Sequence, residues 1–232
     1  MQNLGLPKMG MKLVISGASG KTGYRIAEEA VKAGHKVRLL LRPNSQLPEN
    51  LANCEQRRLA LGDANALDAA LDGFDALIIA TGAKPSPDLT GPARVDALGV
   101  QRQISSCKRV GLKRVVLVSS LCAGRWQHPL NLFGLILVWK RVGERALEQS
   151  DLDWTVIRPG GLNEREENLN KEGILYTTAD SQENDSIPRR LVARCCIESL
   201  GTPTSIGRIV EITSNPEQPL ITMKQAIINF GE

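Results

Sequence analysis

Aromatic side chains are scarce in this sequence of 232 residues, which has three Trp, two Tyr and three Phe. Proteins that bind single-stranded nucleic acid stack the bases on exposed aromatic rings, so the sequence disfavours that class. The net charge of +4 is mild, and no run of Lys or Arg gathers it. Nucleic acid is therefore not an expected partner.

Signatures of metal binding and of export are missing as well. None of the five cysteines forms a C-x-x-C pair, and no Cys/His cluster has zinc spacing. The first 11 residues lack the apolar core of a signal peptide, and the longest apolar stretch, at 130–139, is too short to cross a bilayer. An odd number of cysteines without a secretory signal suits a reducing compartment. We expect a cytoplasmic protein with no metal site and no membrane span.

The sequence does contain a regular alternation of β-rich and helical segments. Strands are predicted at 12–16, 36–41, 56–61, 75–80, 113–119 and 153–158, and helices at 24–33, 64–71, 95–110 and 135–149. Strands and helices that alternate at these intervals indicate βαβ units and a parallel sheet. We predict an α/β protein with a single Rossmann-type domain over residues 1–232, built on a doubly wound parallel sheet.

The pattern loosens after residue 161. The stretch 163–185 is polar and loop-rich, with a short strand at 174–177, and a helix at 188–200, a strand at 208–213 and a helix at 221–228 follow it. This region is too small for a second domain. We predict that residues 163–232 form a small cap over the carboxyl ends of the strands, where open α/β sheets bind their ligands.

A glycine-rich loop, G-A-S-G-K-T-G over residues 17–23, lies between the first strand and the first helix. This context favours a dinucleotide-binding loop, with a tight βα turn without a ligand as the alternative. Gly17 allows the turn, Gly20 lets the backbone approach a pyrophosphate, and Gly23 allows close helix–strand packing. Free amides at the helix start favour the anion. The predicted contacts are Gly17, Ser19, Gly20, Lys21, Thr22 and Gly23.

The end of the second strand indicates which nicotinamide cofactor is bound. A site for NAD places an acid there to accept the ribose hydroxyls, whereas this sequence has Arg42. A guanidinium suits a 2′-phosphate, although an exposed charge at a strand end is the ordinary alternative. Lys21 adds a second cation for the phosphates. We expect NADPH rather than NADH.

Three later segments complete a family resemblance. Ser119 and Ser120 end the fifth strand, Lys140 and Arg141 lie in the long helix, and the run W-T-V-I-R-P-G-G follows at 154–161. With the G-x-x-G-x-x-G loop, these segments resemble the atypical short-chain dehydrogenase/reductases described as NAD(P)H-binding or NmrA-like proteins. That group includes biliverdin and flavin reductases and plastid and cyanobacterial relatives. The likeness is strongest from residue 11 to residue 162.

The resemblance implies roles for further strand ends. Asp63 is expected near the adenine and the backbone of 80–82 near the adenosine ribose, although both segments could be simple turns. Lys140 is expected to bind the nicotinamide ribose, and the loop after the sixth strand to line the nicotinamide pocket. The residues predicted to bind the cofactor in these segments are Asp63, Ala80, Thr81, Gly82, Ser119, Lys140, Pro159, Gly160, Gly161 and Leu162.

One expected residue is absent. Reductases of this superfamily commonly use Tyr-x-x-x-Lys, in which the Tyr is the general acid, but Ile136 stands four residues before Lys140. The catalytic candidates that remain are Lys140 and Ser120, with Ser119 a weaker choice, and a serine hydroxyl is a poor proton donor. His128 is a conceivable acid, with a surface histidine as the alternative. Trp126 and Trp139 are candidates to flank a planar substrate.

Two functions are compatible with an intact cofactor site that lacks this tyrosine. The first is an NADPH-dependent reductase of a planar conjugated acceptor such as a flavin, bilin or quinone, whose nitrogens or oxygens can take a proton from water. The second is a non-catalytic NADPH-binding redox sensor or scaffold, with the acidic segment 164–185 as a contact surface for a protein partner. The long helix, where this superfamily often dimerises, is rich in charge, so we expect a monomer or a weak dimer.

Overall fold

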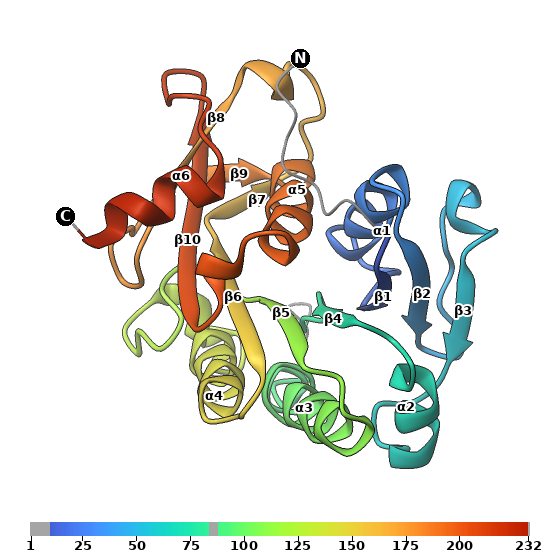
Figure 1. Ribbon diagram of the computed structural model, residues 1–232. Helices are drawn as coiled ribbons and strands as arrows, with labels where there is room; N and C mark the ends of the chain where they lie inside the picture. Colours follow the sequence, from blue (N-terminus) through green and yellow to red (C-terminus); the bar gives the residue numbers. More distant parts are fainter. Residues whose placement is uncertain (1–9, 84–87, 232) are drawn as a thin grey trace.

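The computed structural model describes residues 10–83 and 88–231. Its centre is a sheet of eight strands in the order β3-β2-β1-β4-β5-β6-β10-β8 (Figure 1). Every neighbouring pair is parallel except β10 and β8, which run antiparallel. The order 3-2-1-4-5-6 is that of a Rossmann domain, so the predicted fold class is confirmed. The stretch 1–9, part of the segment expected not to be a signal peptide, lies outside the described residues.

The element bounds lie close to those predicted from the sequence. The strands are β1 Lys12–Ser16, β2 Lys36–Leu41, β3 Glu55–Arg58, β4 Ala76–Ile79, β5 Arg114–Val118, β6 Asp153–Pro159, β7 Gly161–Asn163, β8 Gly173–Thr177, β9 Ser186–Pro188 and β10 Arg208–Asn215. The helices are α1 Gly23–Lys32, α2 Ala64–Leu71, α3 Gly99–Val110, α4 Ile136–Glu148, α5 Arg189–Leu200 and α6 Met223–Ile228. A π-helix, η2 Ala93–Leu98, precedes α3, and short 3-10 turns lie at η1 Glu49–Leu51, η3 Pro129–Leu132, η4 Leu169–Lys171, η5 Pro203–Ser205 and η6 Asn229–Gly231.

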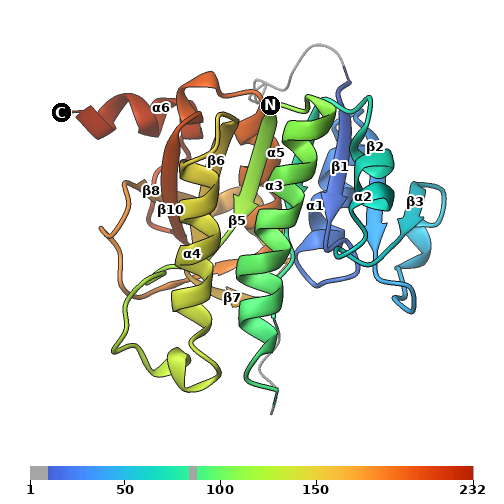
Figure 2. The same cartoon turned by 90° about the horizontal axis from the view of Figure 1, so that it is seen from below.

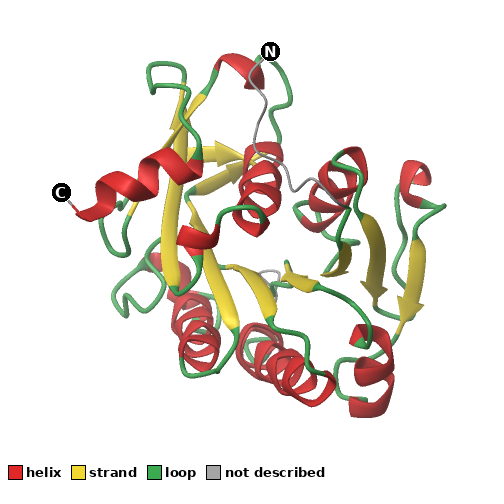
Figure 3. Cartoon of the chain, in the orientation of Figure 1, coloured by secondary structure: helices red, strands yellow, loops and turns green. Residues whose placement is uncertain are grey.

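Helices cover both faces of the sheet, because successive side chains of each strand point to opposite faces. In β1, Leu13 and Ile15 join the apolar core beneath α1 and α5, and Val14 joins the core beneath α2, α3 and α4. Figure 1 shows α1 and α5 on one side of the strands, and Figure 2 shows α2, α3 and α4 covering the other. Colouring by secondary structure makes the three layers visible (Figure 3).

The segment 163–232 mostly extends the sheet, which differs from the predicted cap. β10 pairs with β6 and with β8, and α5 packs against α1. The reason is physical: β10 has buried residues on both faces, Val210 and Ile212 on one and Glu211 on the other, so it belongs inside a sheet. Beyond the carboxyl end of β6 lies only a small parallel pair, β7 with β9, together with the loop that follows β7.

None of the helices in the described ranges is both long enough and apolar enough to span a membrane. All five cysteines are free thiols, and four of them are buried. Cys195 and Cys196 lie in α5 within the apolar core, as expected for packing residues.

Candidate functional site

The glycine-rich loop joins the carboxyl end of β1 to α1, and two of its glycines are fixed by close backbone contacts. Gly17 has a φ of +83°, and a Cβ atom there would lie 2.7 Å from the carbonyl carbon and oxygen of Ala80. A Cβ atom on Gly23 would lie 2.1 Å from the carbonyl oxygen of Gly17. These glycines therefore set how closely α1 and β4 approach the turn, as the sequence predicts.

Gly20 has a different environment. A Cβ atom there would meet one atom within 4 Å, the carbonyl oxygen of Gly17 at 3.2 Å. Thr22 stands at the N-cap position of α1, and no side chain caps the first turn. The amide of Tyr24 donates to the carbonyl oxygen of Gly20 at 3.0 Å, and the other amides of that turn can bind an anion. Gly20 leaves a space that the protein does not fill, which suits the approach of a pyrophosphate.

Three buried hydroxyls follow the carboxyl ends of three strands and make no hydrogen bond within the described part of the chain. They are Ser45 Oγ after β2, Thr81 Oγ1 after β4 and Ser119 Oγ after β5. Buried polar groups are normally paired, since an unsatisfied one costs about 1–3 kcal/mol. Their gathering at one edge of the sheet indicates a polar ligand there. Thr81 and Ser119 are predicted site residues, whereas Ser45 was missed.

Guanidinium groups surround the ends of β2 and β3. Arg42 is exposed and makes no ion pair with the described residues. Arg58, opposite Leu41 in the register, donates to the carbonyl oxygens of Pro43 at 3.1 Å and Ser45 at 2.7 Å. It thus holds the loop that follows Arg42. The sequence analysis did not identify Arg58. A cation at the end of the strand next to β2 could have pointed to it.

Asp63 lies after β3 and forms the N-cap of α2. Its Oδ1 atom accepts a hydrogen bond from the amide of Ala66 at 3.0 Å. Capping explains this residue by itself. Its role near an adenine remains a prediction, and Arg102 lies close by, with Nη1 3.6 Å from the position of a Cβ atom on Gly62.

Lys140 is held at the carboxyl end of β4 by an acid that the sequence analysis missed. Its Nζ lies 2.8 Å from Oδ1 of Asp96, whose Oδ2 accepts the amide of Ala83 at 3.1 Å. Both side chains are largely buried. A Cβ atom on Gly82 would lie 3.8 Å from Lys140 Nζ. Lys140 and Gly82, both predicted cofactor contacts, are therefore adjacent.

The π-helix and a glycine make this ion pair possible. Asp96 lies in η2, and π-helical turns are frequent at functional sites. A Cβ atom on Gly143 of α4 would lie 2.3 Å from the carbonyl oxygen of Asp96. α4 can therefore approach η2 closely enough for Lys140 to reach the carboxylate.

The position of the usual tyrosine is apolar. Ile136, the first residue of α4, packs against a small cluster of Leu121, Cys122 and Leu137. Tyr176 is buried in the core, where burial raises its pKa well above 10.0. His128 accepts the amide of Leu130 through Nδ1 at 3.2 Å and so caps η3. None of these side chains stands in for the missing tyrosine beside Lys140.

The loop after β6 is held by hydrogen bonds to two other segments, the end of β5 and the residues before β9. The carbonyl oxygen of Pro159 accepts the amide of Leu121 at 2.9 Å, and the amide of Gly161 donates to Asp185 at 2.9 Å. A Cβ atom on Gly160 would lie 2.5 Å from the carbonyl oxygen of Asp185. Leu162 is exposed, and Ser120 is half-buried. This loop therefore lies next to the end of β5, and its role in lining a nicotinamide pocket stays a prediction.

A buried ion network supports the same end of β6. Arg158 is fully buried and pairs with Glu144 of α4 at 2.7 Å, Asp180 at 2.9 Å and Glu211 of β10 at 3.3 Å. Glu211 also accepts the amides of residues 180–182. Removing one member of this network would be costly in folding free energy, because it would leave its partner as an uncompensated buried charge. Arg158 thereby fixes the strand that leads into Pro159.

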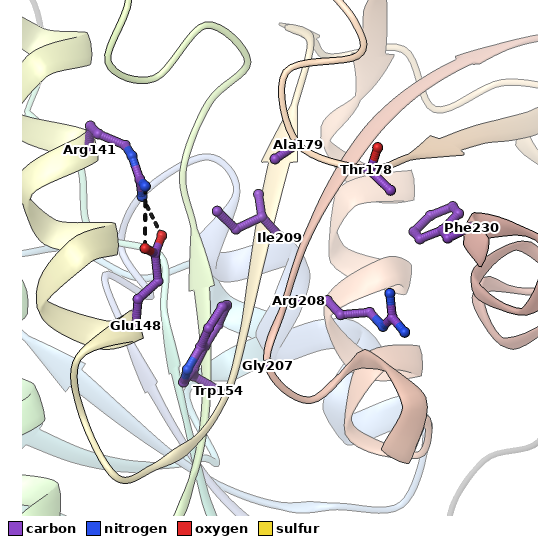
Figure 4. A pocket seen from close by; sticks show the side chains of 9 residues that line it. All are labelled: Arg141, Glu148, Trp154, Thr178, Ala179, Gly207, Arg208, Ile209 and Phe230. Atoms are coloured by element: carbon purple, nitrogen blue, oxygen red, sulfur yellow. Dashed lines mark hydrogen bonds and ion pairs between the residues drawn. The ribbon is translucent and has the colours of Figure 1, made fainter.

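Two surface pockets lie away from this edge. One of about 420 Å³ lies near the beginnings of β6 and β10 (Figure 4) and contains no predicted cofactor residue; its lining is Arg141, Glu148, Trp154, Thr178, Ala179, Gly207, Arg208, Ile209 and Phe230. The other, of about 550 Å³, lies beside α4 and includes Trp126, Val138, Val142 and Arg145. The predicted cofactor cradle is instead the open edge between the strand ends.

Comparison with known proteins decides the family. The model of the NAD(P)H-binding family matches residues 17–203, which is most of the chain. The chain belongs to the NAD(P)H-binding family. This is the atypical branch of the short-chain dehydrogenase/reductases that the motifs resemble.

The chain spans most of the length of two relatives and less than half of a third. An uncharacterized chloroplastic protein of Arabidopsis thaliana is 31% identical over 222 residues, covering 90% of this chain and 78% of the relative. Sanguinarine reductase of Eschscholzia californica is 30% identical over 251 residues, covering 89% and 90%. The chloroplastic protein TIC 62 of Pisum sativum is 28% identical, covering 89% of this chain and 43% of the relative.

Solved structures share the fold. A putative NAD-dependent epimerase/dehydratase from Bacillus halodurans has a TM-score of 0.82 at 26% identity, covering 95% of this chain and 100% of that one. A short-chain dehydrogenase/reductase from Veillonella parvula in complex with NADP has a TM-score of 0.70 at 16% identity, covering 92% and 100%. The anaerobillin reductase ChuY from Escherichia coli O157:H7 has a TM-score of 0.70 at 22% identity, covering 90% and 99%.

The residues of this NAD(P)H-binding protein fit the cofactor that its family implies. Gly20 leaves a cradle that a side chain would fill, and the unsatisfied hydroxyls of Ser45, Thr81 and Ser119 gather at the same edge. Those groups offer hydrogen bonds to a phosphate-bearing, polyhydroxylated ligand. The chain binds NAD(P)H, and the carboxyl edge of its sheet, where Rossmann domains hold dinucleotides, has the groups that would hold it.

Proposed function

We propose that this protein is an NADPH-dependent reductase of a planar conjugated acceptor such as a flavin, a bilin or a quinone. The main support is a complete cofactor cradle beside Lys140 in which Ile136 takes the place of the usual general acid. A carbonyl acceptor needs a proton donor in the protein, whereas a conjugated acceptor can take its proton from water. The sanguinarine reductase among the relatives supports a reductase.

Selectivity for NADPH over NADH rests on the end of β2. Arg42 is exposed there, and Arg58 holds the carbonyl oxygens of Pro43 and Ser45. A 2′-phosphate would meet two guanidinium groups and a free serine hydroxyl, and no carboxylate ends β2 to repel it.

Each predicted residue then has a physical task. Bound NADPH supplies the hydride. Lys140, oriented by Asp96, is placed to donate hydrogen bonds to the nicotinamide ribose. Ser119 and Ser120 are placed to orient the acceptor, and Pro159, Gly160, Gly161 and Leu162 line the pocket and exclude water from one side. Catalysis in this proposal depends on alignment rather than on a protein acid.

One observation favours a second function, in which this chain is a non-catalytic NADPH-binding sensor or scaffold that acts through a protein partner. The loop between β5 and α4 exposes apolar side chains, with Leu132 82% and Trp126 68% exposed; Leu130, Phe133 and Leu135 are also exposed. Five exposed apolar side chains in one loop are more than the scattered single ones of an ordinary surface and are typical of an interaction site. The acidic segment 164–185 is a poorer contact surface than the sequence suggested. Five of its acids, Glu164, Glu166, Glu172, Asp180 and Glu183, pair with cations of the same chain.

The protein is proposed to be a monomer or a weak dimer of a reducing compartment such as the cytoplasm. The free thiols support the compartment. In α4, Arg141 and Glu148 pair with each other and Glu144 with Arg158, so these charges are satisfied without a second subunit.

The test follows the absorbance of reduced nicotinamide while FMN, riboflavin, biliverdin and a simple quinone are added in turn to protein and NADPH. We expect one acceptor class to be reduced, and we expect the double variant Ser120→Ala, Lys140→Ala to lose that activity. Lys113→Ala, an exposed lysine just before β5, is the matched control and retains it. Tight NADPH binding without turnover of any acceptor would favour the partner protein.

A further inference from the structure

Glu164 lies between two cations at the glycine-rich loop. It forms a hydrogen-bonded ion pair with Lys21 of that loop, and its Oε1 lies 3.9 Å from Nη1 of Arg189, at the start of α5. The two cations come from opposite ends of the sequence. One carboxylate thus has two alternative partners, and the closer one is a predicted phosphate contact.

The neighbouring residues hold this segment in place. Glu166 pairs with Arg25 at 2.5 Å and with Arg190 at 3.0 Å. Arg25 is buried and also donates to the carbonyl oxygen of Lys21 at 2.7 Å. The backbone around Glu164 is therefore anchored to the first turn of α1, and a rotation of the Glu164 side chain is enough to change its partner.

The Lys21–Glu164 pair conflicts with a bound dinucleotide. The hydrogen bond from Lys21 holds the pKa of the Glu164 carboxyl below its ordinary value, so the carboxylate stays charged at neutral pH. A pyrophosphate at Gly20 would bring two more negative charges to the same lysine. Like charges this close repel one another, and the pair is exposed and therefore weak.

We propose that Glu164 exchanges Lys21 for Arg189 when the pyrophosphate of the cofactor reaches the glycine-rich loop. The exchange frees Lys21 for the phosphates and turns the long 3.9 Å contact of Glu164 with Arg189 into its main ion pair. Arg189 also donates to the carbonyl oxygen of Leu162 at 3.3 Å, so the exchange links the pyrophosphate site to the loop that lines the nicotinamide pocket.

This inference rests on the proposed position of the pyrophosphate and does not depend on whether an acceptor is reduced. The first measurement is a fluorescence titration of NADPH against the wild type, Glu164→Gln and Glu167→Gln. Glu167 is an exposed acid of the same segment whose side chain makes no ion pair with the described residues. We expect Glu164→Gln to lower the Kd about three- to tenfold and Glu167→Gln to change it less than twofold. Equal Kd values for the two variants would overturn the exchange.

A double-mutant cycle with Lys21→Met separates the exchange from simple repulsion. We expect Lys21→Met to weaken NADPH binding and to abolish the gain from Glu164→Gln. A gain that persists undiminished in Lys21→Met would mean that Glu164 acts by repulsion at a distance, which contradicts the exchange. An unchanged Kd in Lys21→Met alone would instead show that the pyrophosphate lies elsewhere. Arg189→Met completes the test: it should weaken NADPH binding more when Glu164 is present than in Glu164→Gln, where only its hydrogen bond to Leu162 is lost.

Discussion

The ammonium nitrogen of Lys140 lies 2.8 Å from Oδ1 of Asp96, and a Cβ atom on Gly82 would lie 3.8 Å from both atoms. A helix, a π-helix and a strand end therefore meet at one charged contact. The lysine that the family resemblance singles out has its position set by an acid 44 residues earlier in the chain.

Asp96→Asn tests this contact. The amide keeps an acceptor for the Ala83 backbone but leaves the Lys140 charge largely buried and uncompensated. We expect the free energy of unfolding to fall by about 2–3 kcal/mol and NADPH binding to weaken roughly fivefold to tenfold. Urea unfolding measures the change in unfolding free energy, and NADPH titration measures the change in Kd. If Asp96→Asn weakens binding equally in a Lys140→Met background, the two residues are not coupled and the positioning role is wrong.

Arg42→Ala tests cofactor selectivity. We expect the Kd for NADPH to rise about 10- to 100-fold, with the Kd for NADH nearly unchanged, because the guanidinium is placed for the 2′-phosphate. Arg58→Ala should raise the Kd for NADPH less, since it acts by holding the 43–45 loop. Arg57→Ala is the matched control, because Arg57 pairs with Glu55 and leaves that loop alone. Equal losses of NADPH and NADH binding in Arg42→Ala would contradict the assignment.

Two glycines of the same loop should respond in opposite ways to alanine. Gly23→Ala places a Cβ atom 2.1 Å from the backbone oxygen of Gly17, so we expect a loss of about 1–3 kcal/mol in unfolding free energy. Gly20→Ala meets only one protein atom, the carbonyl oxygen of Gly17 at 3.2 Å, which must shift slightly; it should cost much less stability than Gly23→Ala while it weakens NADPH binding. Thermal unfolding with and without NADPH separates the two effects. A strong loss of stability in Gly20→Ala would mean that its space serves the protein rather than the ligand.

Glu198 predicts a specific pH dependence of stability. Burial raises the pKa of its carboxyl above the ordinary value of 4.5, although it accepts the Met223 amide at 2.7 Å and the Tyr176 hydroxyl at 3.3 Å. The folded state therefore holds the proton more tightly than the unfolded state. Its stabilising contribution is complete below pH 4.5 and is lost as the pH rises through the higher folded value.

Glu198→Gln removes this titration but keeps an acceptor for Met223. We expect the unfolding free energy of the variant minus that of the wild type to be larger at pH 8 than at pH 5. Urea unfolding at the two pH values measures the difference, and Glu217→Gln, an exposed acid in a turn, is the control. A stability difference from the wild type that does not change with pH would contradict the raised pKa.

The sequence alone predicts the strands, the helices and the glycine-rich loop, because each depends on residues that are close together in the chain. The strand before Gly17 and the helix after Gly23 are contiguous in the chain, so the glycine-rich loop and its context could be read together. The same holds for the alternation of strands and helices that defines the sheet. Arg42 was found because the end of β2 has a fixed relation to the glycine-rich loop in every such fold.

The remaining site residues depend on contacts between distant segments. Asp96 is an ordinary acid in a helical stretch until the close approach of Gly143 brings Lys140 to it. Arg58 matters because of the register of β3 against β2. The predicted cap included β8, which joins the sheet by antiparallel pairing with β10, a contact between distant segments. The stretch 163–185 is loop-rich around β8, as expected, and its polar residues form ion pairs that no local pattern reveals.

The ion network of Arg158 also has a consequence for the order in which the chain can mature during synthesis. Its carboxylate partners come from α4, from the turn at Asp180 and from β10. The last of these, Glu211, leaves the ribosome more than 50 residues after Arg158 itself. Until then, Glu144 and Asp180 can pair with Arg158, but its third carboxylate is missing and β6 has no neighbouring strand on its outer edge. A truncated product that lacks β10 should therefore expose the unpaired edge of β6 and be prone to aggregation.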